Sequence, residues 1–358
     1  MSNTFGDVFK ITVFGDSHGK AIGGIVDGCM AGLAIDESLL TKELSRRSAG
    51  NDFFSSPRKE MDAFEILSGI MDGKTTGGAI AFTIPNNNVK SDDYLNLDSL
   101  FRPSHADFTY FAKYGTTVSA GKLQASARIF AAVVLGGAIA KQMLHQFGIS
   151  IYGFVNQIGT VSFDKSYKEI KPETIEDSIV RCPDIATSEK MMEELKTVKA
   201  NHDSVGGKIC CVITGCEPGL GDPIFEKLQA RLAHAMFSIN AVKGFEYGSG
   251  FRAAGMTGSQ HNDEFIIKKK KLSTLTNHSG GIQGGITNGE DIYFNVAFKP
   301  APSIGQRQKT IDREANEVEF TASGRHDVCF VPRAVPIVEA MAALVMADTY
   351  LKNMKNAE

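Results

Sequence analysis

The chain lacks the features of several protein classes. Its 358 residues carry a formal net charge of only −3, so no global basic field attracts nucleic acid. No apolar run approaches the roughly 20 residues that cross a bilayer, because the apolar stretch over residues 129–140 ends after 12 residues. We therefore expect a soluble protein that binds neither nucleic acid nor a membrane.

The chain also lacks a Pro/Ser-rich linker, a low-complexity tract and a break in composition, so we expect one large domain over residues 1–358. Its first residues lack the basic start and apolar stretch of a secretory signal. The six cysteines, including adjacent Cys210 and Cys211, show no metal-ligand spacing. These absences predict reduced thiols, a cytoplasmic location and no metal site.

Periodic apolar residues predict strands and helices in mixed order. Phe9, Ile11 and Val13 alternate with polar residues, which is typical of a half-buried strand. Because regular βαβ alternation is missing, we expect an α+β fold rather than a doubly wound sheet. Further strands are expected over residues 79–85, 208–214 and 293–298, and helices over residues 129–147, 223–237 and 337–351.

One more helix is expected to begin after Asp36, which can cap its first turn. Leu39, Leu40 and Leu44 are predicted to share one face of this helix. Two arginines at 46–47 then fall in its last turn, where cations suit the helix dipole.

Glycine is frequent and clusters in one long loop. Residues 277–289 contain five glycines in 13 positions, but they match neither the P-loop nor the dinucleotide-binding pattern. We interpret the segment as a loop that approaches a planar or phosphorylated ligand closely. Lys299 and Ser303 follow the next strand and are candidates to contact a phosphate, although a strand-end lysine is usually solvated. The four lysines at 268–271 are interpreted as a solvated loop.

Two short loops place His18 and His105 among small polar residues, and a third places Arg325 next to a histidine and Asp327. Together these loops indicate an acid/base site built around an anion, because histidine titrates near neutrality and arginine binds anions well. Each histidine taken alone has a plainer alternative as a turn or hydrogen-bonding residue.

Ser126 and Arg128 stand at the start of the apolar helix expected from residue 129. Free backbone N–H groups and the helix dipole make such a position a ready anion site, which Arg128 would strengthen. A capped helix with a solvated arginine explains the same residues, and both readings stay open.

Seven motifs, taken in order along essentially the whole chain, resemble those of the chorismate synthase family in order and spacing. They are GDSHG at 15–19, RPSHAD at 102–107, SAR at 126–128, SINAVKG at 238–244, GGIQGG at 280–285, KPAPS at 299–303 and GRHD at 324–327, which is followed by Arg333-Ala-Val-Pro.

The resemblance implies a β-α-β sandwich, usually assembled as a homotetramer. It also implies conversion of 5-enolpyruvylshikimate 3-phosphate to chorismate and phosphate, the last step of the shikimate pathway. This 1,4-elimination needs reduced FMN without net oxidation, because the hydrogen to be removed is not acidic enough for an ordinary base. The sequence leaves open whether the chain reduces its flavin with NADPH or receives reduced FMN; external supply is expected because no separate reductase-like segment is evident.

The same resemblance implies roles for individual residues. His18 corresponds to the acid near the departing phosphate, His105 to the residue that protonates the reduced flavin, and Asp327 to the carboxylate that acts with the flavin N5 in removing the ring hydrogen. The implied substrate-binding residues are Arg47, Arg102 and Arg128. The implied flavin-binding residues are Ser126, Asn240, Ala241, Gly284, Lys299, Pro300, Ala301, Pro302, Ser303 and Arg325.

Some positions depart from the family pattern. Gln124, Ala125 and Ile129 stand where the family carries an arginine, a serine and a glutamate, so we expect weaker but surviving flavin binding. Phe53 replaces a second arginine found in many members, and Ser104 replaces the glycine of the RPGHAD motif. The alternative function is therefore a paralogue that binds anions and flavin but has lost turnover.

Overall fold

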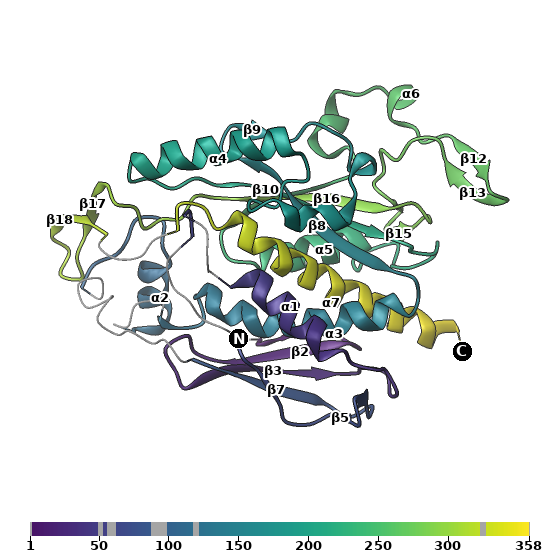
Figure 1. Cartoon of the computed structure of the whole chain (residues 1–358), viewed down its shortest axis with the longest axis horizontal. Helices are drawn as coiled ribbons and strands as arrows, with labels where there is room; N and C mark the ends of the chain where they lie inside the picture. The colour runs from purple at the N-terminus through teal and green to yellow at the C-terminus, as the bar shows by residue number, and fades with distance from the viewer. Residues whose placement is uncertain are drawn as a thin grey trace.

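The computed structural model describes residues 2–48, 53–55, 62–86, 99–116, 122–322 and 327–357. Two five-stranded antiparallel sheets enclose a layer of long helices (Figure 1). The α+β prediction and the β-α-β sandwich implied by the resemblance are both confirmed. The hydrophobic core fills the space between each sheet and the helices.

The first sheet has the strand order β1-β2-β3-β7-β4. Its central strands alternate buried and more exposed positions, as in β7, where Ile80, Phe82 and Ile84 are buried and face the helices. The strand predicted at Phe9 to Val13 is confirmed as β2. The strands are β1 (Thr4–Phe5), β2 (Lys10–Gly15), β3 (Ala21–Asp27), β4 (Glu65–Ile66) and β7 (Ile80–Pro85).

The second sheet has the order β11-β16-β10-β8-β9. Its central strand β10 is buried over five consecutive residues, because α7 lies against one face and α4 (Ile185–Ala200) lies on the outer side of the sheet (Figure 1). Both strands predicted here, β10 and β16, are confirmed. The strands are β8 (Ser150–Ile158), β9 (Val161–Ser162), β10 (Gly207–Thr214), β11 (Val242–Tyr247) and β16 (Ile292–Phe298).

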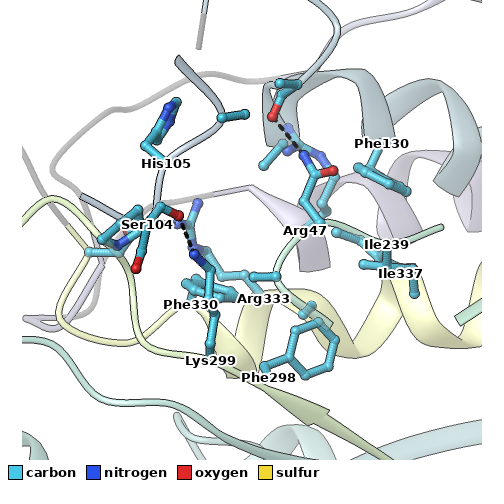
Figure 2. A pocket seen from close by; sticks show the side chains of 18 residues that line it. Arg47, Ser104, His105, Phe130, Ile239, Phe298, Lys299, Phe330, Arg333 and Ile337 are labelled. Carbon is cyan, nitrogen blue, oxygen red and sulfur yellow. Dashed lines mark hydrogen bonds and ion pairs between the residues drawn. The ribbon is translucent and has the colours of Figure 1, made fainter. Parts of the chain in front are cut away.

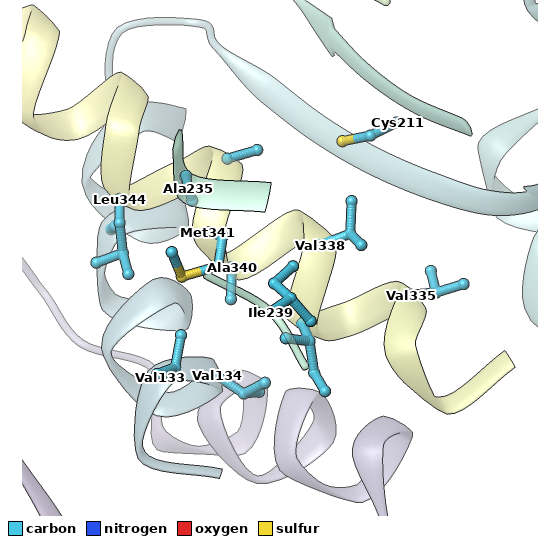
Figure 3. Packing of buried hydrophobic residues seen from close by; sticks show 14 of the residues in the cluster. Val133, Val134, Cys211, Ala235, Ile239, Val335, Val338, Ala340, Met341 and Leu344 are labelled. Carbon is cyan, nitrogen blue, oxygen red and sulfur yellow. The ribbon is translucent and has the colours of Figure 1, made fainter. Parts of the chain in front are cut away.

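The middle layer consists of α1 (Glu37–Arg47), α3 (Phe130–His145), α5 (Leu228–Phe237) and α7 (Val331–Ala357). Helices α3 and α7 cross closely, with Val133 and Val134 near Met341 (Figure 3). Gly137 permits this approach, because an added Cβ would lie 2.4 Å from the Cβ of Ala340. The helical stretches over residues 127–145 and 331–354 are long and apolar enough to span a membrane, but 78% and 94% of their apolar windows are buried inside the protein, as in core helices.

Shorter elements lie at the ends of the sandwich. The lysine run forms the turn of the β12–β13 hairpin, where Lys269 and Lys270 are exposed with φ of 51° and 64°, so the solvated interpretation is confirmed. The remaining elements are α2 (Asp107–Tyr114), α6 (Gly258–His261), η3 (Ala127–Ile129), η4 (Tyr167–Glu169), η5 (Pro172–Asp177), η6 (Gly250–Gly255), β5 (Ile70–Met71), β6 (Lys74–Thr75), β12 (Phe265–Lys268), β13 (Lys271–Thr274), β14 (Ile282–Gln283), β15 (Ile286–Thr287), β17 (Arg307–Ile311) and β18 (Glu317–Thr321).

Two details of α1 and α5 were predicted wrongly. In α1, Leu40 and Leu44 are buried, but Leu39 is 44% exposed, because one residue along a helix turns the side chain by about 100°. Helix α5 begins at Leu228 rather than at residue 223, since Lys227 has an extended ψ of 136° and precedes the first helical turn.

Helix α7 begins at Val331, six residues before the predicted start, and continues through Pro336. Proline lacks an N–H, so the carbonyl of Pro332 has no helical donor. The Nη1 of Arg181 donates to that carbonyl instead. This side chain explains how the helix tolerates an internal proline.

Candidate active site

A cavity of about 330 Å³ opens at one end of the helical layer. It brings together the end of α1, the loop before α2, the start of α3, the turn after α5, the end of β16 and the start of α7. Its lining residues are Arg47, Ser104, His105, Ala106, Ala125, Ala127, Phe130, Ile239, Asn240, Ala241, Phe298, Lys299, Pro302, Asp327, Phe330, Arg333, Ala334 and Ile337.

The cavity has an apolar side and a polar side (Figure 2). Phe130, Ile239 and Ile337 lie on one side, whereas His105 and Ser104 lie opposite them. Among the described residues, the charged lining groups are three cations, Arg47, Lys299 and Arg333, and one carboxylate, Asp327. This excess of positive charge suits an anionic ligand.

His105 is held by two charged residues of its own loop. Its Nδ1 lies 3.0 Å from Nη2 of Arg102 and 3.0 Å from Oδ1 of Asp107. Arg102 and Asp107 are both buried, and the guanidinium donates two hydrogen bonds of 2.7 and 2.9 Å to the carboxylate. Burial alone would raise the pKa of Asp107, but hydrogen bonds from His105 and Arg102 lower it below the ordinary value.

These contacts fix one nitrogen of the imidazole and leave the other available. Nε2 of His105 makes no hydrogen bond to the described part of the chain. It is therefore the ring atom of His105 that can exchange a proton with a bound molecule. Arg102 lies behind the histidine, outside the residues that line the cavity.

Ser104, the departure from the family glycine, has a left-handed backbone with φ of 58°. Glycine adopts this conformation without the steric cost that a Cβ brings, which explains the usual residue at this position. The carbonyl of Ser104 accepts a 2.5 Å hydrogen bond from Nζ of Lys299 (Figure 2). The turn thus links the histidine loop to the end of β16.

Asp327 is paired with a residue that sequence reasoning quoted in a motif but did not assign to the site. The Nη2 of Arg333 donates to Oδ2 of Asp327, and both side chains line the cavity. The Nε of Arg333 is buried and has no hydrogen-bond partner among the described residues. Arg333 therefore orients the carboxylate and retains a free donor.

Arg47 and Arg128 are joined by a buried carboxylate, Asp62. Oδ2 of Asp62 accepts from Nε of Arg47 at 3.1 Å and from its Nη2, whereas Oδ1 accepts from Nη1 of Arg128. Burial would raise the pKa of Asp62, but the two arginines lower it. Burial lowers the pKa of Arg47, and the nearby Arg128 and Arg333 lower it further against the opposing effect of Asp62.

The loop that carries His18 connects β2 to β3 and is held by Asn86. Nδ2 of Asn86 donates to the carbonyls of Asp16 and Gly19 at 3.0 and 2.9 Å, while its Oδ1 accepts from Nε of Arg128 at 3.0 Å. Nδ1 of His18 lies 3.1 Å from Oγ of Ser17. His18 does not line the cavity, but this chain of contacts connects its loop to the cavity arginine through Asp62.

Arg46, which precedes Arg47 in α1, points to a different cluster. Its guanidinium donates hydrogen bonds of 2.6 and 2.9 Å to Glu339 of α7, which also accepts from Lys141 and from the backbone N–H of Gly153. Neighbouring arginines of one helical turn therefore bind two different buried carboxylates, one in the core and one beside the cavity.

Several predicted flavin-binding residues meet at the cavity. Nδ2 of Asn240 donates to the carbonyl of Ala125 at 2.7 Å, and the carbonyl of Ala241 accepts from the backbone N–H of Lys299 at 3.0 Å. Ser126 caps η3 through the backbone N–H of Arg128, as expected for a helix start. Of the segment from 299 to 303, Lys299 and Pro302 line the cavity, whereas Pro300, Ala301 and Ser303 do not.

Gly284, a predicted flavin-binding residue, does not line this cavity. Gly284 lies in the β14–β15 turn, and its neighbour Gly285 accepts a hydrogen bond from the backbone N–H of Leu228 at the first residue of α5. The cavity residues Ile239 to Ala241 follow the other end of that helix. Arg325 lies outside the described residues.

Comparisons with known proteins agree with this arrangement. The sequence matches the family model of chorismate synthase over residues 9–351. The chain belongs to the chorismate synthase family. The chorismate synthase of Christiangramia forsetii is 52% identical over 351 residues, which are 98% of each chain. That of Cytophaga hutchinsonii is 50% identical over 354 residues, which are 99% of this chain and 98% of the relative.

A crystal structure of chorismate synthase shares the fold, with a TM-score of 0.78 and 32% identity over 98% of this chain and 93% of that one. The resemblance seen in the seven motifs is thus confirmed, and so is the expectation of an enzyme, a lyase, rather than a binding module.

Sequence reasoning missed Asp62, Asn86 and Arg333, which hold the predicted site residues in place. Asp107 was quoted in a motif without a role. Sequence signals existed for two of these residues, since Asp107 follows His105 by two residues in a loop with an arginine and Arg333 follows the GRHD motif. Asp62 and Asn86 are distant in sequence from the arginines that they bind, and only the fold brings them together.

Proposed function

We propose that this chain converts 5-enolpyruvylshikimate 3-phosphate to chorismate and phosphate by 1,4-elimination, with reduced FMN as a cofactor that is not consumed. Family membership supports the reaction. The observation that carries the proposal is the single cavity in which His105, Asp327 and Lys299 meet, although they come from three distant motifs.

The charges of the cavity suit this substrate. Two carboxylates and a phosphate make the substrate strongly anionic, and the cavity offers Arg47, Lys299 and Arg333 against one carboxylate. In this proposal Arg47 contacts a substrate anion directly. Arg128 adds positive charge from its place behind Arg47, and Arg102 acts from behind His105.

The cavity walls also fit a flavin. Phe130, Ile239, Phe330 and Ile337 provide apolar surface for a planar ring, and the buried Nε of Arg333, which has no partner among the described residues, provides a donor. The residues proposed to hold FMN are Ser126, Asn240, Ala241, Gly284, Lys299, Pro300, Ala301, Pro302, Ser303 and Arg325. When bound, reduced FMN would supply reversible electron transfer, which would explain a cofactor that is needed without net oxidation.

The protein's own residues supply proton positions and orientation. Nε2 is the ring atom of His105 proposed to exchange a proton with a bound molecule, because Arg102 and Asp107 contact its Nδ1. His18 is the acid proposed for the departing phosphate, on a loop that Asn86 fixes at both ends. Asp327 is proposed to receive the ring hydrogen as a proton, in an orientation set by Arg333.

We also propose a cytoplasmic homotetramer that receives reduced FMN from another source, with NADPH as the ultimate reductant. The six cysteines are buried and form no disulfide with one another, which supports a reducing compartment. Exposed apolar side chains such as Phe225 and Phe251 provide surface for subunit contacts. Light scattering tests the assembly, and turnover with oxidised FMN plus NADPH tests whether the chain needs an external reductant.

The deciding experiment is an anaerobic assay with the substrate and chemically reduced FMN. Chorismate and phosphate should appear in equal amounts, with many turnovers for each flavin. Consumption of one reduced flavin per product would contradict a redox-neutral elimination. Tight binding of substrate and FMN without any product would instead favour the impaired paralogue.

A further inference from the structure

We infer that Asp62 is a positioning residue that fixes Arg47 at the cavity wall by tying it to Arg128. This inference rests on the proposed function, in which Arg47 contacts a substrate anion. Asp62 does not line the cavity, and its side chain is fully buried.

The first step of the argument concerns what holds each arginine. Arg128 has several fixed partners, since Nε donates to Asn86 and Nη2 donates to the carbonyl of Pro85, both at 3.0 Å. Within the described part of the chain, the guanidinium of Arg47 donates to Asp62 alone. Arg47 therefore takes its position from Asp62, and Asp62 takes its position from Arg128.

The second step concerns how the carboxylate divides its oxygens. Oδ1 faces Arg128, whereas Oδ2 faces Arg47 and also accepts from Oγ of Ser48 at 3.2 Å. Because each oxygen of Asp62 accepts from a different arginine, the carboxylate fixes the distance between the two guanidinium groups. One negative charge between two positive ones leaves a net positive charge to attract an anion.

The third step concerns the elements that meet at this point. Arg47 ends α1, Arg128 lies in η3 before α3, and Asn86 follows β7 and holds the His18 loop. Asp62 therefore connects Arg47, through Arg128 and Asn86, to the loop that carries His18. A displacement of Asp62 should therefore disturb the orientation of a bound anion relative to both.

Asp62→Glu is the most informative substitution, because it keeps the charge and changes only the reach of the carboxylate. We expect kcat to fall about 10²-fold, which is the usual scale for small misplacements of orienting groups. Affinity for inorganic phosphate, measured by calorimetry without flavin or substrate, should weaken about tenfold. A carboxylate that only neutralises charge would tolerate glutamate, with both quantities unchanged.

Asp348→Asn is the matched control. Asp348 is equally buried and also paired with an arginine, Arg231, but it accepts from the backbone N–H groups of Val8 and Phe9 and lies far along α7 from Arg333. It should lower the melting temperature while leaving kcat per folded enzyme within about twofold. An equal loss of kcat in this control would show that general loosening, not Asp62, explains the result.

Arg128→Lys covers the case in which Asp62→Glu fails to fold. Lysine keeps the charge but cannot bind Asp62, Asn86 and Pro85 together, so kcat and phosphate affinity should fall as above. Normal values in whichever of the two variants folds would overturn the inference. Failure of the proposed function is distinguishable, because a wild-type chain without turnover still permits the phosphate measurement.

Discussion

Glu339 allows the stability of the helical layer to be tested quantitatively. Its carboxylate is buried and accepts hydrogen bonds from Arg46, Lys141 and the backbone of Gly153. Burial would raise its pKa, but Arg46 and Lys141 outweigh that effect and lower the pKa to about 2. The ionised form of Glu339 is therefore much more stable in the folded chain than in the unfolded chain.

The size of this effect follows from linkage. An unfolded glutamate has a pKa of about 4.3, and each unit of difference is worth about 1.36 kcal/mol, so the ionised Glu339 adds about 3 kcal/mol at neutral pH. Removing one partner of a buried ion pair typically costs about 3 to 5 kcal/mol of stability, which agrees with this value. With an unfolding entropy of about 2.1 cal/mol/K per residue, Glu339→Gln should lower the melting temperature by about 4 °C.

The pH dependence gives a second check. Because the folded pKa is depressed, the stabilisation is complete above the ordinary glutamate pKa and is lost as the pH falls toward about 2. The melting temperatures of wild type and Glu339→Gln should therefore differ by the full amount at pH 7 and become equal in acid. Glu193→Gln, in an exposed pair with Lys196, is the control and should change nothing measurable. A shift below about 1 °C at pH 7, or a gap that persists in acid, would refute the reasoning.

Other substitutions test the site. His18→Ala and His105→Ala should each slow turnover by roughly 10² to 10⁴ with an unchanged melting temperature, and normal rates would mean that the loops are structural. Asp327→Asn should slow turnover similarly in the same assay. Gln124→Arg should tighten FMN about tenfold in a titration with substrate present, unless this exposed position binds flavin differently from the family. Ser104→Gly should add about 0.5 to 1 kcal/mol to the free energy of unfolding in urea, since its φ is 58°; a loss would show that the turn is unstrained.

Much of the fold could be predicted from the sequence because its signals are local. The strand at Ile11 follows from alternation, and the helix after Asp36 follows from a cap and from leucines four residues apart. The start of α7 could not be predicted in this way. Pro336 indicates a break, and only the fold shows that Arg181 supplies the donor that the proline lacks.

Site residues, too, could be predicted only where their partners are close in sequence. His105 and Asp107 share one short loop, so sequence shows them together, and the structure adds only their hydrogen bonds. Asp62 and Asn86 carry no such signal, because an isolated acid or amide in sequence has no visible partner. Their partners are set by the packing of α1, η3 and the first sheet, which depends on contacts between distant residues.

The adjacent arginines at the end of α1 couple substitutions in the core to the geometry of the cavity. Arg46 donates to Glu339 in the core, and Arg47, which lines the cavity, donates to Asp62. A substitution that stabilises the core by rotating or lengthening this turn also moves the cavity arginine. Engineering for heat resistance should therefore leave this turn intact and draw on distant regions, such as the exposed β12–β13 hairpin, none of whose residues lines the cavity.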